Sequence, residues 1–361
     1  MRRPKLSSQP LFFLIKIIKS KRHLKKNLSS VIKILFFLAI GVFFIWLFLR
    51  QLSLEQKREI WQSFITANYS WVILSIFIGI LSHVVRAYRW RILMEPMGYH
   101  PKISNTFFAV MIGYLANMAL PRLGEVTRCG VMNKYEKIPI NKAIGTVIVE
   151  RSIDMVVFLL LFFINLFIFF DELHHYVDSK VYNPLMEKLN ISDEMSSYLY
   201  ALLGVFVLLI ALFFLIRKRI SHLKVYQKLE QIIIGFWNGL WSVTKIKKPF
   251  LFIFQSLLIW VLYYLMIYVC IFSLKETSHL GADAVLSMLI FGSIGIIVVQ
   301  GGIGIYPAII AETLVLYGIV NTYGYALGWL TWTAQTVMIL VAGILSLILL
   351  PIYNKTTNEK A

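Results

Sequence analysis

Two carboxylates and an arginine lie close together inside a long apolar stretch of the chain, residues 143–170. Glu150 and Asp154 are four residues apart, so in a helix they share one face, with Arg151 close beside them. At about 1.5 Å per residue from the start of the stretch, Glu150 lies roughly 10 Å and Asp154 roughly 16 Å into a membrane. Ionised groups at such depth cost at least ~2.5 kcal/mol and usually face a partner or a cavity. The spacing indicates either a site for a charged headgroup or a coupled proton, or an ion network that only holds helices together.

The two carboxylates repel each other and therefore need cations nearby. Five arginines are candidates: Arg86, Arg89, Arg122, Arg128 and Arg151. Arg86 is the deepest of three arginines that end the helix predicted over 70–94. Its neighbours Arg89 and Arg91, together with Trp90, are typical interface anchors, because long cations reach toward water and tryptophan prefers the interface.

A second polar group surrounds a break in the apolar run at 104–120, where Pro121 and Gly124 interrupt helix geometry. A helix that begins after this break would direct free backbone N–H groups at it, and arginine donors suit phosphate oxygens. The break therefore predicts a phosphate site, with an interfacial loop carrying ordinary positive-inside arginines as the alternative. The candidate residues are Asn117, Arg122, Glu125 and Arg128.

The same design occurs near the C-terminus, where the apolar run at 283–300 ends in a glycine-rich break. An offset of about 180 residues places Gly124 on Gly304. Glu312, in the next apolar run, is a counterpart charge to the first site. The candidate residues of this second break are Gln300, Gly302, Gly304 and Glu312.

The composition determines which elements position these groups. The chain has 361 residues, of which 58% are hydrophobic and 15% charged, whereas soluble domains carry roughly 25% charged residues. A spanning helix needs about 20 apolar residues, and several stretches have that length. The predicted class is an all-α polytopic membrane protein with about six full spans and two re-entrant broken hairpins, about eight membrane segments in all.

The net charge of +18 indicates contact with a membrane surface rather than with nucleic acid. Residues 1–30 hold nine basic and no acidic residues just before an apolar run, a pattern that fits an anionic inner leaflet. Basic loops at 85–142 and 217–248 belong inside and the acidic loop at 171–198 belongs outside. We expect a cytoplasmic-membrane protein with both termini in the cytoplasm.

The domain organisation follows from these assignments. We predict a basic cytoplasmic segment at 1–30, one transmembrane domain at 31–350, and a cytoplasmic tail at 351–361. Within the transmembrane domain, two units at about 70–170 and 249–350 each contain one broken hairpin, and the alternation of spans makes the second unit inverted relative to the first. Inverted repeats with discontinuous helices are the architecture of many secondary transporters.

Four motifs in this order resemble the lysylphosphatidylglycerol synthase transmembrane-region family, over about residues 30 to 350. They are Arg86-Ala-Tyr-Arg-Trp-Arg91, Leu120-Pro-Arg-Leu-Gly-Glu125, Val149-Glu-Arg151 with Asp154, and Gln300-Gly-Gly-Ile-Gly304. That family includes the membrane half of the bacterial multiple peptide resistance factor, implicated in flipping aminoacylated lipids, and archaeal proteins linked to dolichol-phosphate sugars. Many relatives have an acidic residue just after the second glycine motif, where this chain has Pro307, so a role at that position would pass to Glu312.

The leading functional hypothesis is a lipid flippase for an anionic or polyprenyl-phosphate-linked lipid. One alternative is an integral-membrane transferase with Glu150 or Asp154 as base, and the other is a non-catalytic scaffold for envelope assembly. We expect no soluble domain after Pro351, and so no aminoacyl transfer. No catalytic residue, metal site or cofactor is predicted. The expected partners are membrane lipids rather than nucleic acid, with a homo-oligomer left open.

Overall fold

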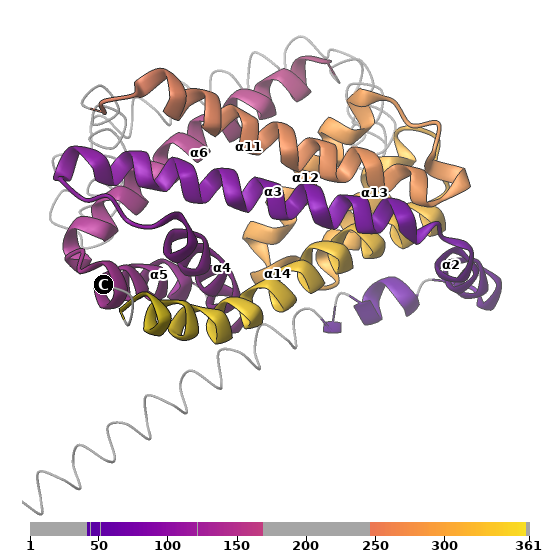
Figure 1. Cartoon of the computed structure of the whole chain (residues 1–361). Coiled ribbons are helices and arrows are strands. Elements are labelled where there is room, and N and C mark those ends of the chain that lie inside the picture. Colours follow the sequence, from indigo (N-terminus) through magenta and orange to yellow (C-terminus); the bar gives the residue numbers. More distant parts are fainter. Residues whose placement is uncertain (1–41, 44, 51, 121, 169–245, 359–361) are drawn as a thin grey trace, which may run out of the picture.

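The protein is described by a computed structural model that covers residues 42–43, 45–50, 52–120, 122–168 and 246–358. The described residues form helices and no strands, which confirms the all-α class. The helices labelled in Figure 1 are α2 (Leu54–Thr66), α3 (Tyr69–Met94), α4 (Ile103–Ala119), α5 (Leu123–Glu136), α6 (Ile140–Ile168), α11 (Pro249–Cys270), α12 (Ala282–Val298), α13 (Ile305–Val315) and α14 (Asn321–Asn358). The segment 1–30, the span predicted at 199–216 and the acidic loop at 171–198 lie outside the described residues.

Three helical segments in the described part of the chain are long and apolar enough to cross a membrane: 69–97, 249–271 and 321–355. Helix α6 has 29 residues and is about 43 Å long, but it carries the charged residues of the predicted site. The chain therefore has the long apolar helices of a membrane protein. The number of six full spans stays a prediction.

The first broken hairpin consists of α4 and α5. Helix α4 ends at Leu120, whose backbone is extended (φ −145°), and α5 begins directly after Arg122, whose backbone is left-handed (φ 63°). The Leu123 amide donates to the Leu120 carbonyl at 3.2 Å, which closes the turn. The break lies where Pro121 and Gly124 predict it, although the residue with the left-handed backbone is an arginine.

The second broken hairpin, α12 and α13, repeats this geometry. Helix α12 has 17 residues, like α4, and its cap Val299 is also extended (φ −115°), followed by a left-handed Gly301 (φ 72°). The Gly302 amide donates to the Val299 carbonyl at 2.7 Å. Val299 follows Leu120 by the same number of residues as Gly301 follows Arg122. This interval is close to that between Gly124 and Gly304.

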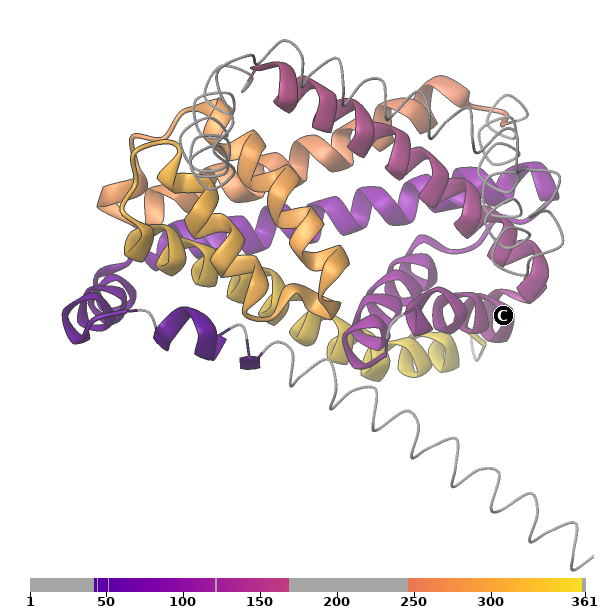
Figure 2. The same ribbon diagram turned by 180° about the vertical axis from the view of Figure 1, so that it is seen from behind.

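The helices that open the two units, α3 and α11, lie side by side and antiparallel (Figure 1). Near the start of α3, the Ser75 hydroxyl donates to the Met266 carbonyl near the end of α11, at 2.8 Å. Near the end of α3, Arg89 donates to Ser256 in the first half of α11, at 3.1 Å. The two broken hairpins lie at opposite ends of this helix pair, as both views show (Figures 1 and 2). Equivalent helices therefore point in opposite directions.

The last helix of each unit packs on the hairpin of the other unit: α14 contacts α4, and α6 contacts α12. Asn354 near the end of α14 donates to Asn105 near the start of α4 at 2.8 Å. Asn165 near the end of α6 donates to Ser287 near the start of α12 at 2.7 Å. This reciprocal packing supports the predicted pair of inverted units.

Helix α14 does not end near residue 350, where the sequence analysis places the end of the transmembrane domain. It continues through Pro351 to Asn358. Proline removes one helical hydrogen bond, but the Asn354 side chain holds the last turns by bonding both Asn105 and the Leu350 carbonyl. Contact with α4 thus accompanies the last turns of α14, and the end of the transmembrane domain at residue 350 stays a prediction.

Candidate functional site

A buried ion network joins α3 and α6. It lies in the halves of these helices that the sequence analysis places nearer the cytoplasm. Glu150 and Asp154 lie on one face of α6, as their spacing predicts, and Glu150 is completely buried. Arg86 of α3 bridges them: its Nη1 lies 2.6 Å from Glu150 Oε1 and 2.9 Å from Asp154 Oδ2. Arg86 is 4% exposed. The prediction that Arg86 reaches the charged site therefore agrees with the geometry.

Arg89, one of the five candidate partners, belongs to the same network, and its interpretation as an interface anchor is wrong. Its side chain is completely buried, with Nη1 2.6 Å from Asp154 Oδ1 and Nη2 3.2 Å from Glu150 Oε1. Arg86 and Arg89 are three residues apart, so they project from one face of α3 toward α6. Arg91 lies on another face and stays partly exposed.

Arg128 of α5 completes the network from the broken hairpin. Its Nη2 lies 3.1 Å from Glu150 Oε2, and its guanidinium carbon lies 4.6 Å from the centre of the Trp90 ring. Trp90 is completely buried and donates its indole N–H to Thr146 at 2.8 Å. Trp90 is therefore a wall of the site, and a cation over its face is stabilised by the ring.

The network has more positive than negative charge. Three buried arginines (Arg86, Arg89 and Arg128) surround two buried carboxylates, and each carboxylate oxygen lies within ion-pair distance of an arginine. The Nε atoms of all three arginines are buried without a hydrogen-bond partner in the described part of the protein. A buried donor without a hydrogen-bond partner is costly, and one of the three positive charges has no carboxylate to balance it. This cluster therefore favours the approach of an anion.

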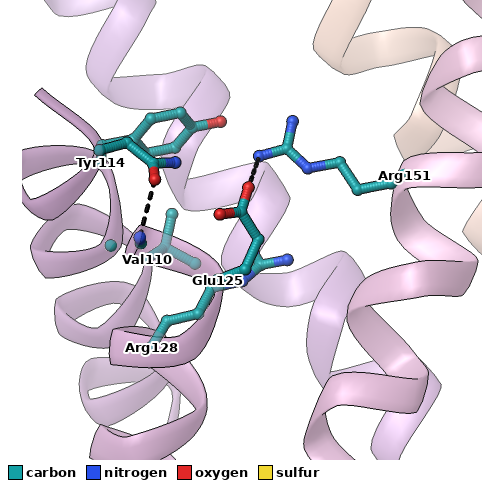
Figure 3. Close-up of a pocket in the computed structure, with 8 residues that line it drawn as sticks. Val110, Tyr114, Glu125, Arg128 and Arg151 are labelled. Atoms are coloured by element: carbon teal, nitrogen blue, oxygen red, sulfur yellow. Dashed lines mark hydrogen bonds and ion pairs between the residues drawn. The ribbon is translucent and has the colours of Figure 1, made fainter. Parts of the chain in front are cut away.

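Arg151 does not join the central network, in contrast to the sequence prediction. Its side chain is 48% exposed and its Nη2 lies 2.8 Å from Glu125 Oε1 of α5. Neighbouring helical residues point about 100° apart, so Arg151 faces away when Glu150 faces inward. Figure 3 shows Arg151 and Glu125 pointing toward each other, with Tyr114 beside them. This pair borders a narrow pocket that Arg128 also lines.

The tip of the hairpin holds the remaining predicted residues of the first unit. The Gly124 amide donates to the Asn117 side chain at 2.7 Å, which ties α5 to α4 across the break. Arg122 is exposed at the start of α5. Arg128 instead turns into the buried network, so the two arginines predicted to bind one phosphate together occupy different environments.

The hairpin depends on a close contact that gives a testable prediction. A Cβ on Gly124 would overlap the Gly113 carbonyl oxygen and lie 2.6 Å from Asn117 Cγ. We expect Gly124→Ala to destabilise the protein by about 1–3 kcal/mol, the usual cost of overpacking. Gly130→Ala in the same helix is the control, because a Cβ there meets no heavy atom within 4 Å and alanine favours helix by up to ~1 kcal/mol. Denaturant unfolding in detergent measures the stability of both variants. Equal stabilities of Gly124→Ala and Gly130→Ala would contradict the close contact at Gly124.

The structure does not bring the second group of predicted residues to this network. Gly302 and Gly304 both have positive φ, 69° and 72°. They belong to the turn that begins at Gln300 and joins α12 to α13. Glu312 is exposed, and its Oε1 accepts a hydrogen bond from Asn321 at 2.8 Å. These four residues belong to the opposite hairpin, α12 and α13 with the turn between them, which lies away from α4 and α5 in Figure 2. Glu312 is therefore not a partner of the buried arginines.

Sequence analysis missed the contribution of α11. Arg86 Nη2 donates to the Tyr263 hydroxyl at 3.0 Å, and Arg89 donates to Ser256 at 3.1 Å. Ser256 and Tyr263 are seven residues apart and share one helix face. That spacing was the available signal, but hydroxyl residues in an apolar helix are common and do not single out these two.

The described residues contain no group of three or more histidine, cysteine, aspartate or glutamate side chains that could hold a metal ion. Cys129 and Cys270 are both buried and free. The polar chemistry of the network is thus that of guanidinium, carboxylate and hydroxyl groups.

Comparison with known proteins gives a consistent result. The chain is 31% identical over 147 residues to a UPF0104 membrane protein of Methanocaldococcus jannaschii, and this alignment covers 40% of the chain and 40% of that relative. No solved structure matches the chain. The family described as the lysylphosphatidylglycerol synthase TM region matches residues 31–343, which include both hairpins and the ion network. The chain therefore belongs to the lysylphosphatidylglycerol synthase transmembrane-region family, a family of membrane proteins related to lipids.

Proposed function

We propose that this protein is a lipid transporter that moves an anionic or polyprenyl-phosphate-linked lipid across the cytoplasmic membrane. The observation that carries this proposal is the buried excess of positive charge, with three arginines against two carboxylates. A phosphate oxygen accepts charge-assisted hydrogen bonds from guanidinium groups, frequently in pairs. A lipid phosphate near Arg128 would balance the charge of the network.

The exposed pair of Arg151 and Glu125 provides the approach to this network. It lies beside Arg128 at the narrow pocket in Figure 3. A partly exposed ion pair contributes only about 0–1 kcal/mol, so an arriving phosphate can replace Glu125 as the partner of Arg151 at little cost. Exposed Arg122, at the tip of the same hairpin, adds a first contact for an anionic headgroup.

The two inverted units fit a transport cycle in which one unit rocks against the other. We place the α5–α6 loop on the cytoplasmic side and the α11–α12 loop outside. Cysteines introduced at exposed Lys137 and Ser278 should then react with an impermeant reagent from opposite sides of the membrane. Background labelling should be low, because Cys129 and Cys270 are both completely buried. Labelling of both positions from one side would contradict the arrangement.

A transferase that uses Glu150 or Asp154 as base is the weaker alternative. A general base needs an available lone pair within reach of its substrate, whereas arginines engage all the oxygens of both carboxylates. For a scaffold, removing charges would impair folding without changing any transport rate. Lipid movement and lipid modification in liposomes therefore distinguish a transporter from a transferase, and a scaffold predicts neither.

Purified full-length protein in liposomes is the test. Phosphatidic acid, phosphatidylglycerol and a polyprenyl phosphate, each labelled on a hydrocarbon chain so that the phosphate stays unmodified, are compared with chain-labelled phosphatidylcholine, which carries no net charge. We expect one or more of the anionic lipids to cross faster than in protein-free liposomes, while phosphatidylcholine does not. Equal rates with and without protein for every lipid would contradict transport, and a chemically altered lipid product would instead indicate a transferase.

A further inference from the structure

A buried histidine of α3 lies beside the ion network. His83 is 3% exposed, and its Nδ1 atom is buried without a hydrogen-bond partner in the described part of the chain. It precedes Arg86 by three residues, so both side chains project from the same side of α3. Buried polar atoms in proteins normally have partners, and histidine is the side chain whose charge most readily changes near neutral pH. The unpaired Nδ1 is therefore a candidate site for a proton.

Tyr114 of α4 links His83 to the narrow pocket. The centres of the His83 and Tyr114 rings lie 4.6 Å apart, and the guanidinium carbon of Arg86 lies 6.0 Å from the centre of the same tyrosine ring. Tyr114 also lines the pocket, together with Arg128 and Arg151 (Figure 3). His83 is thus one aromatic ring away from the place to which the proposed function brings a phosphate.

The charged groups of the network change their charge less easily than a histidine does. Arginine stays protonated in proteins, which applies to Arg86 and to the other two arginines. A proton on Glu150 or Asp154 would break ion pairs with these arginines. The network therefore keeps its surplus of one positive charge near neutral pH.

The other helices that pack on α3 bring no further charge to this region. Helices α4 and α11 carry no charged residue, and α14 carries none before Lys355. The titratable side chains that α4 and α11 place at His83 or at the network are tyrosines, Tyr114 and Tyr263. Glu125 of α5 lies across the pocket in its own ion pair. Among the described residues around the network, His83 is therefore the group best suited to gain or lose a charge near neutral pH.

The surplus charge of the network couples a proton on His83 to an anion in the pocket. A protonated His83 beside Arg86 adds a second positive charge that no carboxylate balances, and burying such a charge is costly. A phosphate in the pocket supplies negative charge and lowers this cost. Because linkage is reciprocal, a phosphate that favours the protonated histidine is itself bound more tightly when His83 carries the proton.

We propose that His83 takes up one proton when a lipid phosphate binds, and that the protein moves lipid and proton together across the membrane. This inference rests on the proposed function and adds its driving force. Movement of the Tyr114 ring lets hydronium from the pocket give its proton to Nδ1, so that one N–H bond forms and water remains. The reverse step releases proton and lipid on the other side. A monoanionic lipid moved with one proton carries no net charge, so a pH difference alone can drive it.

The first measurement counts the protons that the protein takes up when lipid binds. Full-length protein in detergent is titrated at neutral pH with short-chain phosphatidylglycerol in two buffers of different ionisation enthalpy, and calorimetry gives protons per lipid. Phosphatidylglycerol is a phosphodiester that keeps its single charge at this pH, so any proton goes to the protein. We expect about one proton per lipid for the wild type and none for His83→Gln. The control His100→Gln, which changes an exposed histidine, should behave like the wild type.

A polyprenyl phosphate is the second probe in this measurement. Its phosphate monoester itself titrates near pH 6, so the difference in proton uptake between wild type and His83→Gln replaces the absolute count. We expect the same difference of about one proton per lipid as with phosphatidylglycerol.

The second measurement uses liposomes whose interior is one pH unit more alkaline than the outside. Trace phosphatidylglycerol, labelled on a hydrocarbon chain, should favour the inner leaflet by up to about tenfold at equilibrium with the wild type, because one proton per lipid transfers the pH ratio to the lipid. With His83→Gln the two leaflets should hold equal amounts, as far as protein-free liposomes do.

Failure of the coupling and failure of transport give different results. If the wild type binds and moves lipid without proton uptake and without a response to the pH difference, transport stands and the coupling is overturned, whether or not His83→Gln folds. Proton uptake that persists in a folded His83→Gln protein would also overturn the role of His83. If neither phosphatidylglycerol nor the polyprenyl phosphate binds, the proposed function and this inference fail together.

Discussion

Glu150→Gln is expected to lower the free energy of unfolding by about 3–5 kcal/mol, the usual loss when one partner of a buried ion pair is removed. The glutamine keeps the size of the side chain but removes the negative charge that faces Arg86, Arg89 and Arg128. The network then holds three buried guanidinium groups against Asp154 alone. Thermal or denaturant unfolding in detergent, followed by circular dichroism, measures the loss.

Glu125→Gln is the matched control for this prediction. It removes a carboxylate from the same part of the protein, but Glu125 and its partner Arg151 have side chains 27% and 48% exposed. Such an exposed pair is worth about 0–1 kcal/mol. If Glu150→Gln were no more destabilising than Glu125→Gln, the ion network would not hold α6 against α3 and α5.

Arg128→Gln is expected to cost less stability than Glu150→Gln but to remove most of the preference for anionic lipids. With Arg128 neutral, two arginines face two carboxylates, so the buried charge is balanced and Glu150 keeps Arg86 and Arg89 as partners. A hydrogen bond to a charged group contributes about 1.5–3 kcal/mol. Loss of one such bond to phosphate corresponds to a loss of about tenfold to a hundredfold in affinity.

Transport in liposomes measures this effect as the ratio of the rate for an anionic lipid to the rate for phosphatidylcholine. Lys134→Gln is the control, since Lys134 is an exposed cation on the same helix. Its ratio should equal that of the wild type. An unchanged ratio for a folded Arg128→Gln protein would show that Arg128 does not contact the phosphate and that the network serves packing alone.

The sequence was sufficient to locate the two breaks and the charged helix face. Pro121 restricts the backbone wherever it stands, and residues four apart share a face in any helix, so Glu150 and Asp154 had to project together. An offset one residue shorter than that between Gly124 and Gly304 appears in the backbone, where Leu120 and Arg122 are matched by Val299 and Gly301. These features are local, and local rules predict them.

The partners of the charges were not predictable in the same way. Arg151 is adjacent to Glu150 in sequence, yet it turns outward to Glu125, while Arg89, expected at the interface, is completely buried. An arginine in a membrane helix can be exposed or buried, so the residue type alone does not distinguish the two positions. The packing of α3 and α5 on α6 decides between them, because it determines which side of each helix meets protein and which meets the pocket.

By itself the sequence determined that this is a helical membrane protein with a pair of buried carboxylates and two broken hairpins, because composition, spacing and backbone restriction depend only on neighbouring residues. The tertiary structure alone decided that three arginines surround those carboxylates, that Tyr263 of α11 joins the network, and that α14 continues past Pro351. These outcomes depend on contacts between helices far apart in sequence, and the free energy of such contacts has no signature in the local pattern.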